Sequence, residues 1–343
     1  MSRNGEGSGV RLPLQGGLPP VDAVAGTAVE IACDESGFSG TNLLDPATPV
    51  ITHASVDLSV DEAVGLITAL RSGFRFSPHE LKSGQFLRSP KAGEALEWFL
   101  AALAGRAHVH LVDKEYFLVT RIVDLLLAEP TYAAGTRLTA DHRPAALALY
   151  RAGRATDGPA WGVFVAAFVD LVRTKGRHRP DRQALERFFR ARDALTPGAP
   201  AQDVLDRLDP TRVWAVLTRL FDDDRSIPPP LEPLLPALAE TVLFWSDGKR
   251  RVLVVHDEQS ALTAGRLGRL QRVLADARLS PLAGLVMVDS RDDARVQVAD
   301  LLAGMARRLP GIVDGPLRPF VSPTSLRDPE RRRRGREEGA PVG

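Results

Sequence analysis

Five short apolar runs, all rich in β-branched residues, stand out along the chain. Each is too short for an independent helix and too continuously apolar for a strand with one face in solvent. Such runs are typical of central strands that other elements cover on both faces of a sheet. We therefore expect strands at residues 29–36, 49–58, 107–114, 251–258 and 282–290.

Helical patterns lie between these runs. Ser59 with Glu62, and Ser77 with Glu80, have the Ser-x-x-Glu spacing of a capping box, in which each side chain bonds the other residue's backbone at a helix start. A Ser-Pro pair marks a third helix start, just before the apolar pattern of residues 93–105. Strands that alternate with helices in this way predict an α/β fold.

The stretch 116–248 breaks the alternation, because it contains apolar helical segments and Pro/Gly-rich turns but no convincing strand. The strand pattern resumes at Arg251, so we expect an all-helical insertion within one α/β domain rather than a separate domain. The expected organisation is a disordered tail at 1–27, a core in two parts at 28–115 and 249–310, the insertion at 116–248, and a flexible C-terminal tail at 311–343.

Composition narrows the class of protein. The chain has 343 residues, with 44 Lys and Arg against 43 Asp and Glu, for a formal net charge of +1. This excludes a disordered chain or a polycationic tail, and any contact with nucleic acid must come from a local basic patch. Cys33 is the only cysteine, and no apolar stretch reaches the roughly 18 residues of a membrane span. We therefore expect a cytoplasmic protein without a membrane association.

Four of the five apolar runs end in an aspartate. If the runs form parallel neighbouring strands, their carboxyl ends lie along one edge of the sheet, where α/β proteins bind ligands. Carboxylates that meet there repel one another, so protons or a bound cation must compensate. Oxygen ligands without a cysteine cluster favour Mg²⁺ or Mn²⁺. The four residues are Asp34, Asp113, Asp257 and Asp289.

A fifth aspartate lies on the last predicted helix, whose residues 296–305 are apolar nearly all round, which predicts burial. Asp300 shares one face of this helix with Gln297 and Gly304. A buried carboxylate is costly unless it is paired or bound to a metal. We expect Gly304 to let this face lie close to the sheet and so bring Asp300 near the aspartates at the strand ends.

Each acidic residue also has a purely structural interpretation. An aspartate after a strand is an ordinary turn or helix-capping residue. This interpretation is favoured for Asp113, which Lys114 can neutralise, and for Asp289, which stands in a polar turn. Glu80 can equally close its capping box or bind a metal. Asp300 can form a salt bridge with an arginine of the insertion.

With these residues in place, the chain resembles the bacterial domain-of-unknown-function family 3800, which has a ribonuclease H-like fold. The resemblance spans residues 29–308 and leaves out the helical insertion. It implies an α/β, ribonuclease H-like mixed sheet flanked by helices, with a large all-helical insertion. The matching pieces are DESG at 34–37, ELK at 80–82, DE at 257–258, DS at 289–290 and QVAD at 297–300.

The resemblance also implies a site. In ribonuclease H-like enzymes, acidic residues on the first strand, a following helix, a later strand end and the final helix hold two divalent ions. Carried over to this chain, these residues are Asp34, Glu80, Asp257 and Asp300, although strand counting also allows Asp113 as the third.

Two ions held in this way would support hydrolysis of a phosphodiester bond. The expected function is therefore a metal-dependent nuclease or phosphodiesterase, with nucleic acid as its substrate and Lys82 near a substrate phosphate. The alternative is a non-catalytic module on the same fold that binds nucleic acid or protein.

A nuclease also needs a surface for the phosphate backbone. The basic segment 173–192 is one candidate, through Arg177, Arg179 and Arg182. The favoured interpretation of its Phe188 and Phe189 is the buried face of an amphipathic helix. His108 and His110 share one face of a strand with a spacing that zinc could use, but no third ligand is evident nearby.

Overall fold

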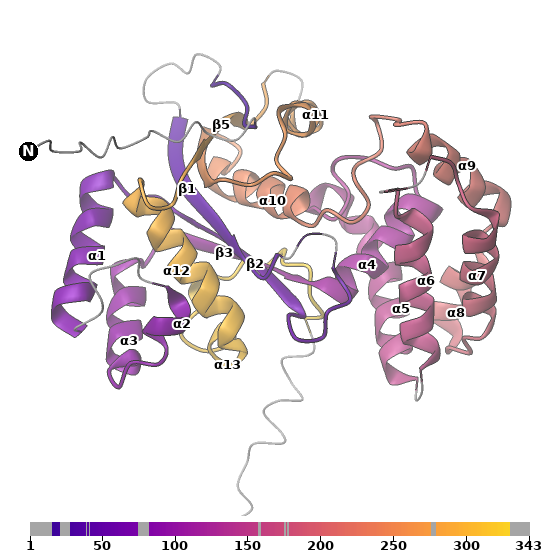
Figure 1. The fold of residues 1–343 in the computed structure, drawn as a ribbon, viewed down its shortest axis with the longest axis horizontal. Helices are drawn as coiled ribbons and strands as arrows, with labels where there is room; N and C mark the ends of the chain where they lie inside the picture. The colour runs from indigo at the N-terminus through magenta and orange to yellow at the C-terminus, as the bar shows by residue number, and fades with distance from the viewer. Residues whose placement is uncertain are drawn as a thin grey trace, which may run out of the picture.

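The structure is a computed structural model that describes residues 16–20, 28–38, 40, 42–74, 82–156, 159–174, 176, 178–275 and 279–329. A five-stranded sheet lies at its centre, between helices on both sides (Figure 1). Each strand coincides with one of the five apolar runs, so the prediction of an α/β fold is confirmed. The strands are β1 (Ala28–Ser36), β2 (Val50–Val56), β3 (Ala107–Asp113), β4 (Arg251–Asp257) and β5 (Leu282–Val288).

The sheet is mixed, with the strand order β3-β2-β1-β4-β5. β1, β4 and β5 are parallel neighbours, whereas β2 is antiparallel to both β1 and β3. β3 therefore runs in the same direction as β1, and four strands end at the same edge of the sheet. The strand-end aspartates of β1, β4 and β5 are neighbours at that edge, while β2 separates the end of β3 from them.

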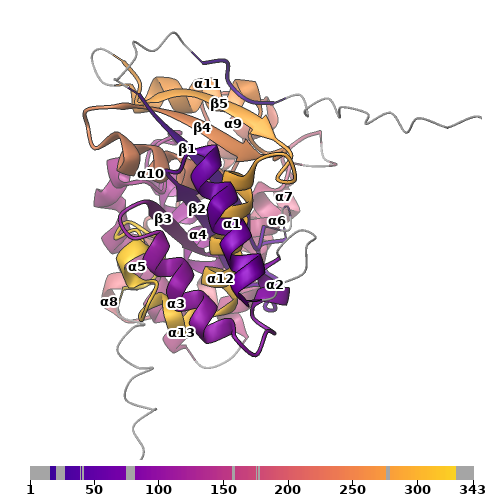
Figure 2. The same cartoon turned by 90° about the vertical axis from the view of Figure 1, so that its left-hand side faces the viewer.

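Three helices cover one face of the sheet, which we call the α12 face. They are α1 (Val60–Phe74), α3 (Ala92–Ala102) and α12 (Ala294–Arg308). Figure 2 shows α1 and α3 side by side, with the sheet behind them. The capping box that starts α1 forms as predicted, because Glu62 accepts from the Ser59 amide at 2.7 Å and the Ser59 hydroxyl accepts from the Glu62 amide at 3.3 Å.

One long helix, α10 (Leu234–Ser246), covers the opposite face, which we call the α10 face. It contacts β2, β3 and β4, and nearly all of its residues are buried. Ile31 and Cys33 of β1 face this side, whereas Ala32 packs in the core cluster of the α12 face. Successive residues of β1 therefore point to opposite faces, each of which has its own core.

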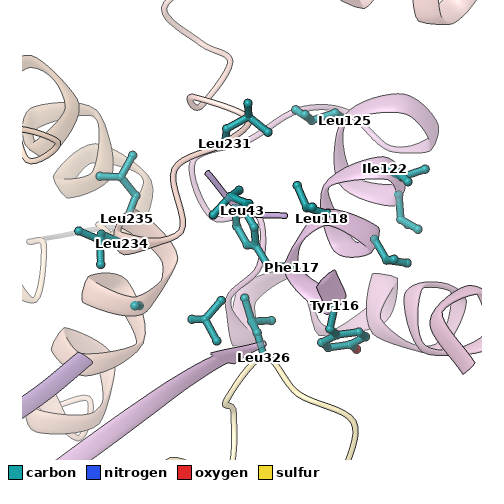
Figure 3. Close-up of a cluster of buried hydrophobic side chains, with 14 of the residues drawn as sticks. Leu43, Tyr116, Phe117, Leu118, Ile122, Leu125, Leu231, Leu234, Leu235 and Leu326 are labelled. Atoms are coloured by element: carbon teal, nitrogen blue, oxygen red, sulfur yellow. The ribbon is translucent and has the colours of Figure 1, made fainter. Parts of the chain in front are cut away.

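The other helices lie mainly to the far side of α10, on the right in Figure 1. Their core is continuous with the core of the α10 face. Figure 3 shows Phe117 and Leu118 of α4 beside Leu43, which precedes β2, and Leu231 of the proline-rich segment before α10. These elements are α4 (Lys114–Ile122), the π-helical turn Val123–Leu127, the 3₁₀ helix Arg137–His142, α5 (Arg143–Ala155), α6 (Ala160–Val172), α7 (Arg182–Asp193), α8 (Ala199–Asp206) and α9 (Pro210–Phe221).

The remaining described elements are α2 (Ser83–Phe86), α11 (Ala264–Leu274), α13 (Pro310–Val313) and the 3₁₀ helix Arg318–Phe320. Two segments within the expected tails also have defined places. The Leu18 and Leu285 amides each donate to the other residue's carbonyl, at 2.9 and 2.8 Å, which ties residues 16–20 to β5. Near the C-terminus, Val321 and Leu326 form bridges to β3. No helix in the described ranges is long and apolar enough to cross a membrane.

Candidate metal centre

Helix α12 is aligned alongside β1, and both run in the same direction. Near its start, Arg295 pairs with Glu30 of β1. Near its end, the Arg307 Nε donates to the Ser36 hydroxyl at 2.9 Å. Between these points, the Thr52 hydroxyl of β2 donates to the Ala303 carbonyl at 2.7 Å. These contacts fix the register of α12 and place Asp300 beside the carboxyl end of β1.

Three of the expected metal ligands interact electrostatically at this place, since Asp257 and Asp300 both act on Asp34. Asp34 is only 5% exposed, and burial is the largest cause that raises its pKa. Repulsion from Glu35, Asp300 and Asp257 raises the pKa of Asp34 further. Burial also raises the pKa of Asp257, although its Oδ1 accepts from the Ser290 amide at 2.9 Å. The site is therefore an electrostatically strained group of carboxylates from β1, β4 and α12.

Asp300 has a cationic partner, but this partner is not an arginine of the insertion. The Lys82 Nζ lies 3.3 Å from Asp300 Oδ2, with the lysine side chain 52% exposed and the aspartate 20% exposed. Lys82 immediately precedes α2. Because it is largely solvated, this ion pair holds Asp300 only weakly. Gln297 lies one turn earlier on α12 and is half-buried.

The role expected of Gly304 needs a correction. A Cβ at Gly304 would lie 2.1 Å from the Ser83 Oγ and 2.5 Å from the Ser83 Cβ. The glycine therefore allows close approach of α12 to α2 rather than to the sheet. α2 follows Lys82 directly, so this approach also sets where Lys82 meets Asp300.

Glu80, the fourth expected ligand, falls in 75–81, outside the described residues. Arg177 is also outside the described residues. The other two aspartates at strand ends have local partners. Asp113 caps α4, since its Oδ1 accepts from the Tyr116 amide at 3.0 Å, and its Oδ2 accepts from the Tyr150 hydroxyl at 3.2 Å. Asp289 accepts from the Arg291 amide at 2.9 Å and pairs with its guanidinium. Of the two alternatives for the third ligand, Asp257 is the one that acts electrostatically on Asp34.

Lys114 was expected to neutralise Asp113, but its partner is different. The Lys114 Nζ donates to the Thr48 hydroxyl at 3.0 Å, and Asp45 is the nearby carboxylate that favours its charged form. Two cavities of about 340 and 490 Å³ share Pro49 and Asp113 in their linings. Neither is lined by the carboxylates of the candidate site.

Sequence reasoning missed Glu35, which alternates to the α10 face and is the register partner of His53. The Gln259 amide donates to Glu35 Oε1 at 2.5 Å. Glu35 Oε2 is buried with no hydrogen-bond partner among the described residues, 3.9 Å from His256 Nε2. Burial raises the pKa of this carboxyl. The period-2 alternation of a strand, applied to the acidic pair after Cys33, was the signal that could have found it.

Four histidines are buried on the α10 face. Burial, and then repulsion from the other three, lowers the pKa of His53 well below its usual value. Burial lowers the pKa of both His108 and His110 to about 3. Neither ring of that pair has a hydrogen-bond partner in the described part of the chain. The fourth histidine, His256, is also fully buried.

The expected nucleic-acid arm is in large part a packed helix. Phe188 of α7 is fully buried and stacks on Phe164 at 5.2 Å, so the favoured structural interpretation of this residue is confirmed. Arg179 and Arg182 are exposed. The Arg182 guanidinium lies 5.3 Å over the Trp214 ring of α9.

The chemistry of the donors fits a hard divalent cation, because they are carboxylate oxygens that repel one another. Across the described residues, however, no group of three or more His, Cys, Asp or Glu side chains is already arranged to hold a metal ion. The carboxylates therefore converge without forming a finished cage, and the expected fourth ligand lies in 75–81. No family model matches the sequence, and neither a search of curated proteins nor a search of solved structures finds a significant similarity.

Proposed function

We propose that this protein is a divalent-metal-dependent nuclease or phosphodiesterase that acts on nucleic acid. The observation that carries the proposal is the convergence of Asp34, Asp257 and Asp300, with Asp34 buried under the repulsion of the other two. The Glu35 amide donates to Asp34 Oδ1 at 2.6 Å, but this bond offsets only part of the cost of burying a carboxylate beside other carboxylates. A bound cation offsets that cost.

Three of the five pieces of sequence that carry the family resemblance lie at strand ends or in α12, as the proposal expects. Residues 34–37 end β1, residues 257–258 end β4, and residues 297–300 lie in α12. The mixed sheet with helices on both faces is compatible with that fold. These placements support the proposal of a ribonuclease H-like core with a helical insertion.

In this proposal Asp34, Glu80, Asp257 and Asp300 hold Mg²⁺ or Mn²⁺. When bound, two such ions supply an activated water and stabilise the leaving oxygen of an in-line displacement at phosphorus. Asp34 has the central place, since both other aspartates act on it. The Ser290 amide holds the Asp257 carboxylate in one orientation.

Lys82 has two roles in this proposal. In the metal-free protein it neutralises part of the charge of Asp300. Its side chain is half exposed and flexible, so it can turn toward a substrate phosphate once a cation takes over that neutralisation. The exposed Arg179 and Arg182, together with Arg177, provide a more distant contact with the phosphate backbone.

Two substitutions test the assignment. Asp34→Asn and Asp300→Asn each remove a charge but preserve the shape of the side chain. We expect each to lower Mn²⁺-dependent cleavage of labelled RNA and DNA more than about 100-fold. Loss of a metal ligand should exceed the 10- to 100-fold loss typical when a group that only orients a ligand is removed. Circular dichroism should show an unchanged fold.

The matched control is Asp292→Asn, because Asp292 is an exposed acidic residue just before α12. This variant should cleave as the wild type does. Isothermal titration of the wild type with Mn²⁺ separates the enzyme from the non-catalytic module: two sites support the enzyme, and no site supports the module. Unchanged cleavage in both site variants would contradict the assignment.

A further inference from the structure

A hydrogen-bonded chain of buried side chains runs across the α10 face toward the candidate site. The hydroxyl oxygen of Thr241, in α10, lies 3.0 Å from His53 Nδ1. The Nε2 atoms of His53 and His256 are 3.2 Å apart. The Nδ1 of His256 lies 2.9 Å from the backbone carbonyl oxygen of Asp257. All three side chains are completely buried.

The chemistry of these groups sets the direction of the chain when both rings are neutral. A carbonyl oxygen can only accept, so His256 carries its proton on Nδ1 and donates to Asp257. Its Nε2 is then an acceptor, and His53 must carry its proton on Nε2. The His53 Nδ1 is in turn an acceptor, for which the Thr241 hydroxyl is the donor. Each proton position follows from the one before it.

The end point of the chain is a residue of the proposed metal centre. Asp257 is held on its other side by the Ser290 amide, which donates to its carboxylate. The backbone and the side chain of Asp257 are therefore both fixed by hydrogen bonds. Outer groups of this kind set the orientation of a metal ligand and are worth 10- to 100-fold in metal affinity in other proteins.

We propose that Thr241, His53 and His256 are positioning residues that fix the end of β4 and thereby orient Asp257 for a divalent cation. This inference rests on the proposed function, since it assigns these residues to the same site. It makes α10 part of the metal centre, although α10 lies on the opposite face of the sheet and contributes no ligand. A shift of α10 changes the affinity for the cation.

A pair of substitutions at His53 separates the chain from simple packing. His53→Gln places an amide N–H near the position of Nε2 and keeps a donor for His256. His53→Asn keeps a polar group near Nδ1 for Thr241 but leaves His256 without its donor. We expect the asparagine variant to bind Mn²⁺ about 10-fold more weakly by isothermal titration. The glutamine variant should stay within about threefold of the wild type.

Ser55→Ala is the matched control. The Trp245 Nε1 of α10 donates to the Ser55 hydroxyl of β2 at 2.8 Å. The substitution thus removes another buried hydrogen bond between the same helix and strand, but one without a connection to Asp257. We expect lower stability with unchanged affinity for Mn²⁺. Equal losses of affinity in the Ser55→Ala and His53→Asn variants would overturn the proposal.

A spectroscopic measurement tests the chain in the metal-free wild type, without dependence on folding of the variants. Nitrogen-15 chemical shifts should show His53 protonated at Nε2 and His256 protonated at Nδ1, with a scalar coupling between the two Nε2 atoms. The reverse proton positions, or zinc in the purified protein held between the two Nε2 atoms, would overturn the chain itself.

The two proposals can fail separately. If the wild type shows the expected proton positions and binds Mn²⁺ but His53→Asn has no effect on affinity, the positioning role is wrong and the proposed function stands. If the wild type binds no Mn²⁺, the proposed function is wrong, and the positioning role falls with it even where the proton positions are as expected.

Discussion

The two faces of the sheet bury titratable groups in opposite ways. On the α12 face, Asp257 and Asp300 both act electrostatically on Asp34, and burial raises the pKa of Asp34 and Asp257. On the α10 face, His53, His108 and His110 are buried, and burial lowers the pKa of each. Both shifts favour the neutral form, but for the carboxyl groups that form is protonated and for the imidazoles it is not.

This difference between the aspartates and the histidines bears on the proposed metal site. Histidines lose little by staying neutral above their ordinary pKa, so the imidazoles of the α10 face need no ligand near neutral pH, although the buried Glu35 on the same face also has a raised pKa. Carboxylates near neutral pH must either keep protons against a strong driving force or share a cation. In the proposed function the aspartates of the α12 face share a divalent ion, and the following predictions test the contrast between these aspartates and the histidines of the α10 face.

The largest expected effect is acid destabilisation through the α10 face. His108 and His110 have a folded pKa of about 3, whereas an unfolded histidine titrates near 6.5. Between these values the unfolded state binds more protons. The contribution of the two neutral rings to the free energy of unfolding is therefore fully present only above about pH 6.5 and decreases as the pH falls. From pH 7.5 to 5 the loss is about 2 kcal/mol for each ring, or about 4 kcal/mol together.

Urea unfolding of the double variant His108→Leu/His110→Leu checks this expectation. Its stability should depend on pH by about 4 kcal/mol less than that of the wild type over the same interval. His178→Asn, at an exposed position, is the control and should retain the wild-type slope. A double variant with the wild-type slope would remove the basis for the contrast between the faces.

Glu232 should make stability depend on pH in the opposite direction, by a slightly smaller amount. It is 7% exposed, and burial raises its pKa to about 7. The unfolded group titrates near its ordinary value of 4.5. Its stabilising contribution is therefore complete below about pH 4.5 and is lost as the pH rises to 7, at a cost of about 3 kcal/mol.

Glu232→Gln should remove that loss, because an amide stays neutral and its oxygen can still accept from the Leu234 amide. We expect a gain of up to about 3 kcal/mol at pH 7.5 and a much smaller difference at pH 4.5. Denaturant unfolding at the two pH values measures it. The same gain at both values would mean that a change in packing, rather than titration, causes it.

The sequence was sufficient for the strands and for part of the site. All five apolar runs became strands because a buried strand needs nothing beyond local apolar character. Asp300 was identifiable because a charge on a helix that is apolar all round conflicts with burial. Its partner was not identifiable. Lys82 lies 218 residues away in sequence, and tertiary packing, including the close approach at Gly304, brings α2 to α12.

The histidines and Glu35 show a second limit of prediction from the sequence. Their chemistry depends on strand register, since β2 runs antiparallel to β1 and places His53 opposite both Glu35 and His110. No local pattern gives the direction of β2 or its neighbours in the sheet. The convergence of His53 on His256 also crosses β1, so it requires the complete strand order.

A divalent cation should stabilise the α12 face. The metal competes with protons for the carboxylates, so its apparent affinity rises with pH. At a free Mn²⁺ concentration 100 times the dissociation constant, we expect a stabilisation of about 2.7 kcal/mol. A fixed Mn²⁺ concentration should stabilise more at pH 7.5 than at pH 5.

Thermal unfolding with Mn²⁺ and then with excess EDTA measures this effect. Asp34→Asn should lose the Mn²⁺-dependent increase in melting temperature, while His108→Leu/His110→Leu should retain it. If the Asp34→Asn variant responds to Mn²⁺ as the wild type does, the cation binds elsewhere.

The smallest expected effect comes from Gly304, where α12 touches α2. In Gly304→Ala the new Cβ would lie 2.1 Å from the Ser83 Oγ, so α2 must move or Ser83 must change its rotamer. Overpacking of this kind costs about 1–3 kcal/mol, and the higher helix propensity of alanine offsets up to about 1 kcal/mol. We expect a net loss of about 1–2 kcal/mol, measured by urea unfolding.

Two further variants identify the cause. Ser83→Gly in the Gly304→Ala background removes both atoms that the new methyl group meets, so it should restore most of the loss. Gly162→Ala, in α6 with nothing within 4 Å of the added Cβ, should instead gain up to about 1 kcal/mol. If Gly304→Ala gains stability as Gly162→Ala does, α2 can move away from the new methyl group at little cost in free energy. In that case the contact between α12 and α2 does not fix the position of Lys82. The ion pair between Lys82 and Asp300 would then form independently of the packing of these two helices.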